Sequence, residues 1–288
     1  MIIHHPFIIH FGPLTLTGFG LAVLFAFGIA QVISQRELAR RGEDPTPISD
    51  LILAAVIGGL LGAKIYYVIL KGDIHAFLSR GGFVFWGGLV GGILAVIFTI
   101  RYKKLDMWKI ADPAGMAVAA AYAIGRTGCW AVGDDYGRPW QGFLAVQFPD
   151  GAPPSTALNL QSEFGVQIPP GVSPDTVLSV YPTQLFEVAM GVTMFIILWR
   201  MRDHRHAPGW LFGVYMVLAG IERFLIEFLR AKDDRFLGIL TVAQLLALLF
   251  IAGGFLWMWM RRGPTMASPA HAGQALDART SAPPPRRV

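Results

Sequence analysis

Residues 51–70, LILAAVIGGLLGAKIYYVIL, form a continuous apolar run whose only charged residue is Lys64. A helix needs about 20 mostly apolar residues to cross the hydrocarbon core of a bilayer, so this run predicts a transmembrane helix. Further runs of this kind lie at 16–34, 83–100, 111–132, 183–199, 210–229 and 238–260. Charged residues make up only 15% of the chain, against roughly a quarter in soluble domains. The sequence therefore predicts an all-α polytopic membrane protein with about seven transmembrane helices.

Lys and Arg residues are distributed unevenly between the two sides of these segments. None precedes the first segment, twelve follow the odd-numbered segments and six follow the even-numbered ones. Because basic residues accumulate in cytoplasmic loops, the pattern predicts an N-out/C-in orientation. The net charge of +5 then reflects topology, and since no basic stripe is interleaved with aromatic residues, we expect no nucleic-acid partner. No basic region precedes the first apolar run, so no cleavable signal peptide is expected.

The segments divide the chain into five parts. Residues 1–15 are expected to form an outer interfacial segment, and 16–132 the first four transmembrane helices. The Pro- and Gly-rich stretch 133–182 is too long for a bare connection and predicts a small extracytoplasmic subdomain between helices 4 and 5. Residues 183–260 supply helices 5–7. The Pro/Ala/Ser/Arg-rich residues 261–288 predict a disordered cytoplasmic tail.

Ionisable residues lie inside several predicted spans, where they are costly and usually mark function. Arg126 is in the fourth span and Glu187 in the fifth. The sixth contains Arg223, Glu227 and Arg230 at i, i+4 and i+7, which places them on one helix face. These charges could simply pair with one another or extend to the interface. Alternatively, Arg126 and Arg223 form a clamp for a lipid phosphate, because a guanidinium offers paired donors to phosphate oxygens.

Glycine-rich runs occur in the second and third predicted spans. They are GGLLG at 58–62 and WGGLVGG at 86–92. Small residues at this spacing usually allow two helices to pack closely. The alternative is that a ligand approaches the backbone at Gly87 and Gly88, where the third span begins. No metal site or cofactor is predicted, since the single cysteine, Cys129, leaves no zinc-type ligand set and no disulfide.

Several further motifs accompany the 86–92 run in a fixed order. They are GRTG at 125–128, GDDYGRP at 133–139, YPTQLFE at 181–187, RFLIEFLR at 223–230 and GILTVAQ at 238–244. In order, spacing and placement, the set resembles the prolipoprotein diacylglyceryl transferase family over roughly residues 5–262. Each motif alone is weakly specific, whereas together they are highly specific.

The resemblance implies a transferase of the bacterial cytoplasmic (inner) membrane. Members of this family move the diacylglyceryl group of phosphatidylglycerol onto the lipobox cysteine of a preprolipoprotein, whose signal peptide is the protein partner. By position, Arg126 would hold the lipid headgroup, Arg223 would act on the same phosphate, and Glu227 and Glu187 would orient these groups. The matching substrate-binding positions are Arg126, Gly87, Gly88, Asp134, Gly137, Gln184, Glu187 and Arg230, and the catalytic ones are Arg126, Arg223 and Glu227.

The chain departs from the family pattern at several positions. Trp86 stands where the family has histidine, and Cys129 where it has asparagine. The remaining departures are Phe19, Tyr181, Phe186 and Ala219. Because tryptophan cannot act as a base, Asp134, Asp135 or Tyr181 would have to assist the thiol, or the electropositive site alone would activate it. The alternatives are a phospholipid-dependent transferase with another acceptor and a non-catalytic lipid- or lipoprotein-binding paralogue.

Overall fold

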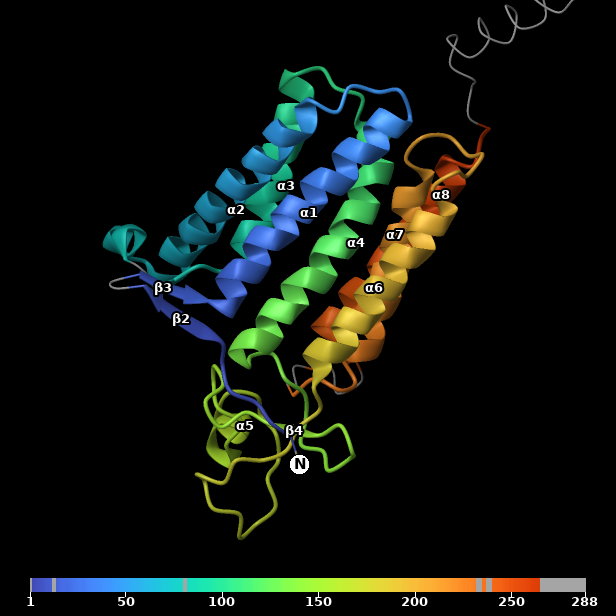
Figure 1. The fold of residues 1–288 in the computed structure, drawn as a ribbon. Helices are drawn as coiled ribbons and strands as arrows, with labels where there is room; N and C mark the ends of the chain where they lie inside the picture. Colours follow the sequence, from blue (N-terminus) through green and yellow to red (C-terminus); the bar gives the residue numbers. More distant parts are fainter. Residues whose placement is uncertain (1, 12–13, 80–81, 232–234, 237–239, 265–288) are drawn as a thin grey trace, which may run out of the picture.

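The computed structural model describes residues 2–11, 14–79, 82–231, 235–236 and 240–264. Within them, long helices dominate and run along a common direction (Figure 1). The long helices are α1 (Gly18–Arg40), α2 (Pro47–Lys71), α3 (Phe85–Tyr102), α4 (Met107–Val132), α6 (Thr183–Met201), α7 (Trp210–Ile226) and α8 (Val242–Met260). The short elements are β1 (Ile2–Ile3), β2 (Ile8–Phe11), β3 (Leu14–Thr17), η1 (Ile74–Leu78), β4 (Val146–Gln147), α5 (Ala157–Ser162), β5 (Arg235–Phe236) and β6 (Leu240–Thr241).

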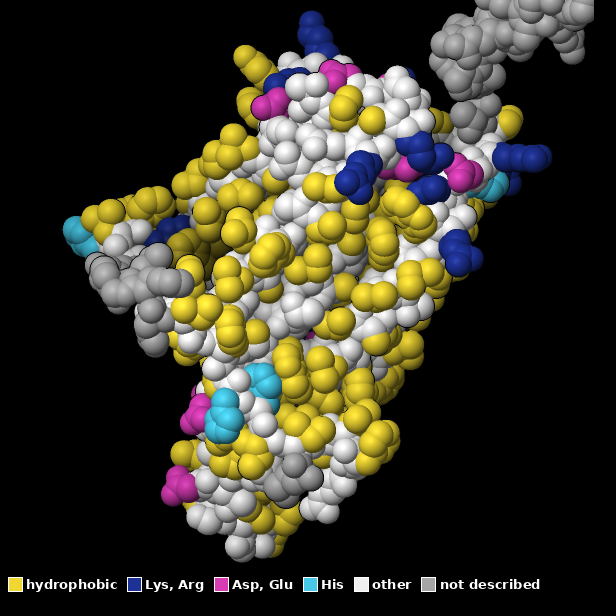
Figure 2. Space-filling model, viewed as in Figure 1, with side chains coloured by type: hydrophobic (Ala, Val, Ile, Leu, Met, Phe, Trp, Pro, Cys, Tyr) yellow, Lys and Arg dark blue, Asp and Glu magenta, His cyan; other side chains and the backbone are white. Residues whose placement is uncertain are grey.

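Five of these helices, α1, α2, α3, α6 and α8, are long and apolar enough to cross a membrane. Large apolar side chains are exposed along the length of the bundle, whereas most of the Lys and Arg side chains visible in Figure 2 lie toward one end. The chain is therefore a mostly helical, multi-pass membrane protein, as predicted. The two remaining long helices do not meet this criterion of length and hydropathy. Helix α7 has only 17 residues, and α4 is rich in Ala and Gly, with ten buried residues. The number of seven spans and their orientation stay predictions.

Helix α4 lies between α1 and α6 (Figure 1), and its small residues permit close contact with both. Gly128 approaches Ala22 and Phe19 of α1, and Gly191 of α6 approaches Ala123. The core between these helices is apolar and includes Met116, which is fully buried. Because α4 is central, its last turn brings the segment that follows it close to the ends of α6 and α7.

Local sequence signals determine where the helices begin and end. Asp106 caps α4 by accepting a hydrogen bond from the Trp108 amide, and Gly133 ends it with a left-handed φ of 71°. Thr241 and Gln244 form a reciprocal capping box at the start of α8. The predicted start of the last span at residue 238 and most of the predicted tail, 265–288, lie outside the described residues.

Residues 133–182 form a folded segment at the end of the bundle opposite the one where Figure 2 shows most exposed Lys and Arg side chains (Figures 1 and 2). It contains β4 and α5 and has a small apolar cluster that includes the fully buried side chains of Phe148 and Leu160. The N-terminal strand β1 pairs with β4, with Ile2 opposite Val146. The N-terminus and this segment therefore pack together, next to the last turn of α4.

Candidate active site

Arg126, in the last two turns of α4, is held by two carboxylates. Its Nη1 lies 2.8 Å from Oδ2 of Asp135, and its Nη2 lies 3.0 Å from Oε1 of Glu187 on α6. Its guanidinium also lies over the ring of Tyr122, one turn earlier on α4. Arg126 thus joins α4 to α6 and to the loop that follows α4, and its guanidinium plane is fixed by contacts on both edges.

Arg230, just after α7, contacts the same two carboxylates from the other side. Its Nη2 lies 2.8 Å from Oδ1 of Asp135, and its Nη1 lies 4.0 Å from Oε1 of Glu187. Although burial opposes ionisation, Arg230 and Arg126 together lower the pKa of the Asp135 carboxyl to about 2. Two arginines therefore converge on one small anionic group, which is the arrangement that a bound phosphate would need.

A chain of ion pairs continues from this centre to Arg223. Arg230 Nε lies 3.8 Å from Oε2 of Glu227, and the same oxygen lies 2.7 Å from Nη2 of Arg223. Arg223 is the more accessible end, with 34% of its side chain exposed, whereas Glu227 is buried. The predicted pair Arg126 and Arg223 is thus connected through Arg230 and two carboxylates, and the arginine nearest to Arg126 in this chain is Arg230.

Behind Arg126, Tyr122 connects two buried glutamates. Its hydroxyl lies 3.1 Å from Oε1 of Glu187 and 2.8 Å from Oε1 of Glu222. A tyrosine hydroxyl has one proton and so can donate to only one carboxylate at a time. The contact orients Glu187 toward Arg126 and joins α4, α6 and α7.

The loop after α4 is fixed by the start of α6 and the end of α7. Thr183 donates from Oγ1 to the Asp135 carbonyl at 2.7 Å, and Gln184 donates from Nε2 to the Asp134 carbonyl at 2.5 Å. Gly137 lies against the Leu229 carbonyl, so any side chain at this position would clash with backbone. Asp135 itself adopts a left-handed φ of 58°, which turns its carboxylate back toward the arginines. Gln184 and Gly137, both predicted to bind substrate, thus hold the loop after α4 in place.

Asp134 and Cys129 lie beside Arg126 on the loop side. The Cys129 sulfur is 3.7 Å from Arg126 Nη1, and ligand atoms of Cys129, Asp134 and Asp135 lie within 4.8 Å of one another. Burial, with the adjacent charge of Asp135, raises the pKa of the Asp134 carboxyl to about 6. These three donors could in principle hold a metal ion. However, two guanidinium groups already occupy the carboxylate of Asp135, and their charge disfavours a cation there.

Some buried polar atoms at this centre have no hydrogen-bond partner among the described residues. They include Oε2 of Glu187, Nη1 of Arg230, Oδ1 of Asp134 and Oε1 of Gln184. Buried polar groups in native proteins are almost always satisfied, so unmatched donors and acceptors grouped together indicate a place for water or a polar ligand. Because both donors and acceptors are available, the place suits an anionic ligand that also carries hydroxyl groups.

The glycines Gly87 and Gly88, also predicted to contact substrate, take part in another contact. They face α2, where a side chain at Gly87 would meet the Gly62 carbonyl and one at Gly88 would meet the Gly59 carbonyl. Trp86 is 54% exposed and packs edge-on against Phe85. The structure therefore accounts for these glycines by helix packing, and their contact with substrate stays a prediction.

The sequence does not indicate the roles of Tyr122 and Asp135 in the charged centre. Tyr122 precedes Arg126 by one helical turn, so helix spacing is the signal that points to it. The sequence suggests Asp135 only as a base, because its position between two arginines depends on a left-handed turn and on the end of α7. No local pattern indicates that convergence.

Comparisons with known proteins identify relatives over most of the chain. A family model described as prolipoprotein diacylglyceryl transferase matches residues 6–260. A phosphatidylglycerol–prolipoprotein diacylglyceryl transferase of Paraburkholderia phymatum is 30% identical, with 92% of this chain and 96% of the relative covered. A protein of the same name from Nostoc sp. is 30% identical over 90% of this chain and 91% of the relative. Another, from Halalkalibacterium halodurans, is 27% identical over 94% and 91%.

Proposed function

Because the chain belongs to the prolipoprotein diacylglyceryl transferase family, we propose that it transfers the diacylglyceryl group of phosphatidylglycerol to the lipobox cysteine of preprolipoproteins. In this reaction the cysteine sulfur attacks the diacylglyceryl carbon bonded to the phosphate oxygen. A carbon–sulfur bond forms, the carbon–oxygen bond breaks, and glycerol phosphate leaves. The observation that carries the proposal is the convergence of Arg126 and Arg230 on the carboxylate of Asp135.

The lipid phosphate would take the place that Asp135 occupies between the two arginines. Arg126 and Arg230 already present donors 2.8 Å from that carboxylate, so a phosphate there would need little rearrangement of either guanidinium. Negative charge grows on the phosphate as the carbon–oxygen bond breaks, and fixed arginines stabilise it. Arg223, the more exposed end of the ion-pair chain, would bind the same phosphate, while Glu227 and Glu187 hold the arginines in position.

Phosphatidylglycerol is an anion with free hydroxyl groups on its headgroup. The unmatched oxygens of Glu187 and Gln184 are suited to accept hydrogen bonds from such hydroxyls. Gly137 would keep the loop close enough for Asp134 to reach the headgroup. At Gly87 and Gly88 the backbone of α3 would line the path of the lipid.

The thiol must lose its proton, and Trp86 cannot accept it. Asp134 is the carboxylate best suited to this step, because its pKa of about 6 makes it ionised yet basic near neutral pH. Asp135 is a weaker base, since the two arginines hold its pKa near 2.

The proposed function also requires a particular orientation in the membrane. With seven spans, the N-terminus outside and the C-terminus inside, the charged centre and the extracytoplasmic subdomain 133–182 would both be on the outer side of the bacterial inner membrane. The gathering of Lys and Arg at the opposite end of the bundle supports this orientation (Figure 2). The subdomain would then be available to receive the signal peptide of the acceptor.

The proposal can be tested in cells depleted of their own transferase. Expression of this chain should give a diacylglyceryl adduct on the lipobox cysteine of a reporter lipoprotein, detected by mass spectrometry of its N-terminal peptide. Arg126→Ala should abolish the adduct, and Arg126→Lys should restore little of it because lysine lacks the paired donors. The matched control is Arg101→Ala, in the last turn of α3, which should behave as the parent chain.

An unmodified reporter in cells that express the chain in their membranes would contradict the proposal. If the protein nevertheless bound phosphatidylglycerol in an Arg126-dependent manner, that result would favour the non-catalytic paralogue. A diacylglyceryl adduct on a protein other than the reporter would favour a different acceptor.

A further inference from the structure

Glu222 of α7 is a buried acid that the proposed reaction does not use. Only 6% of the residue is exposed, and its Oε1 lies 2.8 Å from the Tyr122 hydroxyl. It forms no ion pair with the described residues, although Arg223 is its neighbour in the chain. A buried carboxylate without a counter-charge is costly, whereas a neutral carboxylic acid needs only hydrogen-bond partners.

The arginines around Glu222 pair with other carboxylates. These pairs are Arg126 with Glu187, Arg223 with Glu227, and Arg230 with Asp135. Helix α8, which packs against α7, has no ionisable residue. Within the described part of the chain, no cation is therefore left to compensate a charge on Glu222.

The position of the Tyr122 hydroxyl requires a second proton. It lies 3.1 Å from Oε1 of Glu187 and 2.8 Å from Oε1 of Glu222. The single hydroxyl proton serves only one of these oxygens, so the other contact would set lone pair against lone pair unless one carboxyl were protonated. Because Arg126 compensates the charge of Glu187, the proton belongs on Glu222.

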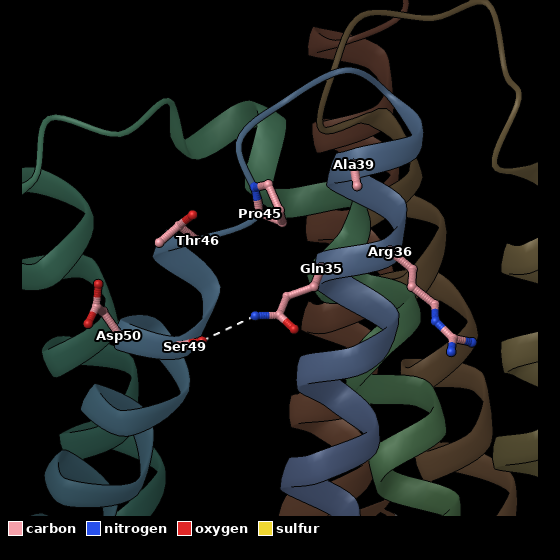
Figure 3. A pocket seen from close by; sticks show the side chains of 7 residues that line it. All are labelled: Gln35, Arg36, Ala39, Pro45, Thr46, Ser49 and Asp50. Carbon is pink, nitrogen blue, oxygen red and sulfur yellow. Dashed lines mark hydrogen bonds between the residues drawn. The ribbon is translucent and has the colours of Figure 1, made fainter.

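A hydroxyl with two side-chain partners also lies between α1 and α2, and it needs no such proton. Gln31 and Gln35 each donate from Nε2 to Ser49 Oγ at 3.1 Å, and Figure 3 shows the contact made by Gln35. Both partners are amides, which bring their own protons. Tyr122 differs because both of its partners are carboxyls, and an ionised carboxylate has no proton to donate.

We propose that Glu222 carries a proton at neutral pH and is a positioning residue of the transferase centre. As a neutral acid it donates to the Tyr122 hydroxyl. That hydroxyl then donates to Oε1 of Glu187, which faces Arg126. The result is a chain of hydrogen bonds with one direction, from α7 through α4 to α6, which ends on the carboxylate that holds Arg126.

The neutral acid also limits the negative charge of the centre. Its three arginines already pair with three carboxylates, and an ionised Glu222 would add another. Each additional negative charge nearby weakens the binding of a lipid phosphate. This consequence rests on the proposed function, whereas the protonation of Glu222 does not.

The first test detects the proton itself. Infrared spectra of the purified full-length chain are recorded near pH 8, where Asp134, with a pKa of about 6, is ionised. The C=O stretch of a protonated carboxyl shifts when its proton is exchanged for deuterium, which separates it from the ester carbonyls of bound lipid. We expect such a band in the parent chain and its loss in Glu222→Gln. Glu163→Gln, at an exposed glutamate, is the matched control and should keep the band.

The second test uses the initial rate of adduct formation on the reporter lipoprotein. Glu222→Gln should stay within about twofold of the parent chain, because an amide can donate to Tyr122 as the neutral acid does. Glu222→Leu has no donor and should be slower by about tenfold, as expected for the loss of one hydrogen bond. In a Tyr122→Phe chain, Glu222→Leu should add little further loss, since Glu222 acts through that hydroxyl.

A band that survives in Glu222→Gln and disappears in Glu187→Gln would place the proton on Glu187 and overturn the proposal, as would a parent chain without the band. Equal loss of activity in Glu222→Gln and Glu222→Leu would overturn the positioning role of the neutral acid. If Glu222→Leu failed to fold, the band and the activity of Glu222→Gln would still decide. A parent chain that forms no adduct would contradict the proposed function instead, and the infrared result would still decide whether Glu222 carries the proton.

Discussion

Two helix contacts in this protein are built from opposite materials. The α2–α3 hairpin is held along its length by glycines facing glycines, with Gly58 and Gly62 against Gly87 and Gly91. An ion pair, between Asp50 and Lys103, lies at one end of this hairpin. The contact of α4 with α6 and α7 at the end of the bundle next to residues 133–182 is held instead by Arg126, Glu187 and their neighbours. Both contacts come from motifs that resemble the same family, so a shared motif does not imply a shared physical role.

The difference has a physical reason. In lipid, helices gain little from the hydrophobic effect on association, so close backbone packing or polar contacts must hold them together. Glycines achieve this by close backbone packing, without burying a charge. Buried ion pairs gain little net stability for the cost of desolvation, and retaining them is favoured where charges also serve a ligand. Under the proposed function, the α4–α6–α7 contact is therefore the part of the bundle in which stability and activity depend on the same residues.

The largest effect on stability is expected from breaking the charged contact on one side only. Arg126→Met leaves Glu187 without its nearest charged partner and leaves Asp135 with Arg230 alone, and it should cost about 4 kcal/mol of unfolding free energy. Replacing Glu187 by methionine as well should recover much of that loss, because an apolar pair does not strand a charge. Unfolding in detergent measures both variants. If Arg126→Met were as stable as the control variant Arg101→Met, this contact would not contribute to stability.

A smaller loss is expected from filling the glycine contact. Gly62→Leu forces a side chain into the Gly87 carbonyl and should cost about 3 kcal/mol, since backbone on both helices must move apart. Activity of the remaining folded protein should be reduced less than by Arg126→Ala. The matched control is Gly28→Ala, which meets open space and should leave stability unchanged or slightly higher. Equal unfolding temperatures for the two variants would mean that the hairpin is not held by close packing.

Hydropathy predicted most of the fold, because every helix that crosses the lipid needs about 20 mostly apolar residues. Each predicted span corresponds to a long helix among the described residues, although α1 continues beyond its apolar part to Arg40. The site was only partly predictable. Helix spacing placed Arg223 and Glu227 together, but the convergence of Arg126 and Arg230 on Asp135 depends on a turn with φ of 58°. Contacts between distant segments leave no periodic pattern.

Tyr122 sharpens the comparison, because it belongs to the charged contact without carrying charge. Tyr122→Phe removes the hydroxyl that lies between Glu187 and Glu222 and keeps the ring under Arg126. We expect a loss of about 1.5 kcal/mol in stability and a fall in activity, since Glu187 loses a group that orients it. Tyr215→Phe on α7 is the control. If activity were unchanged, Glu187 would be positioned by the arginines alone.

The smallest effect comes from Asp134, whose pKa of about 6 lies above its ordinary 3.8. Ionising it costs the folded state stability, and this cost is absent below about pH 3.8 and complete above about pH 6. Asp134→Asn should therefore gain on the order of 1 kcal/mol at pH 7–8, and the gain should vanish near pH 4.

Asp135 behaves oppositely, because its lowered pKa stabilises the fold above pH 3.8 and that contribution is lost toward pH 2. Unfolding temperatures of the parent chain and of Asp134→Asn from pH 4 to 8 measure the effect of Asp134. If Asp134 is also the base, the activity of the parent chain falls below pH 6, and this fall is missing from the residual activity of Asp134→Asn. A stability gain that does not vary with pH would contradict this account of Asp134.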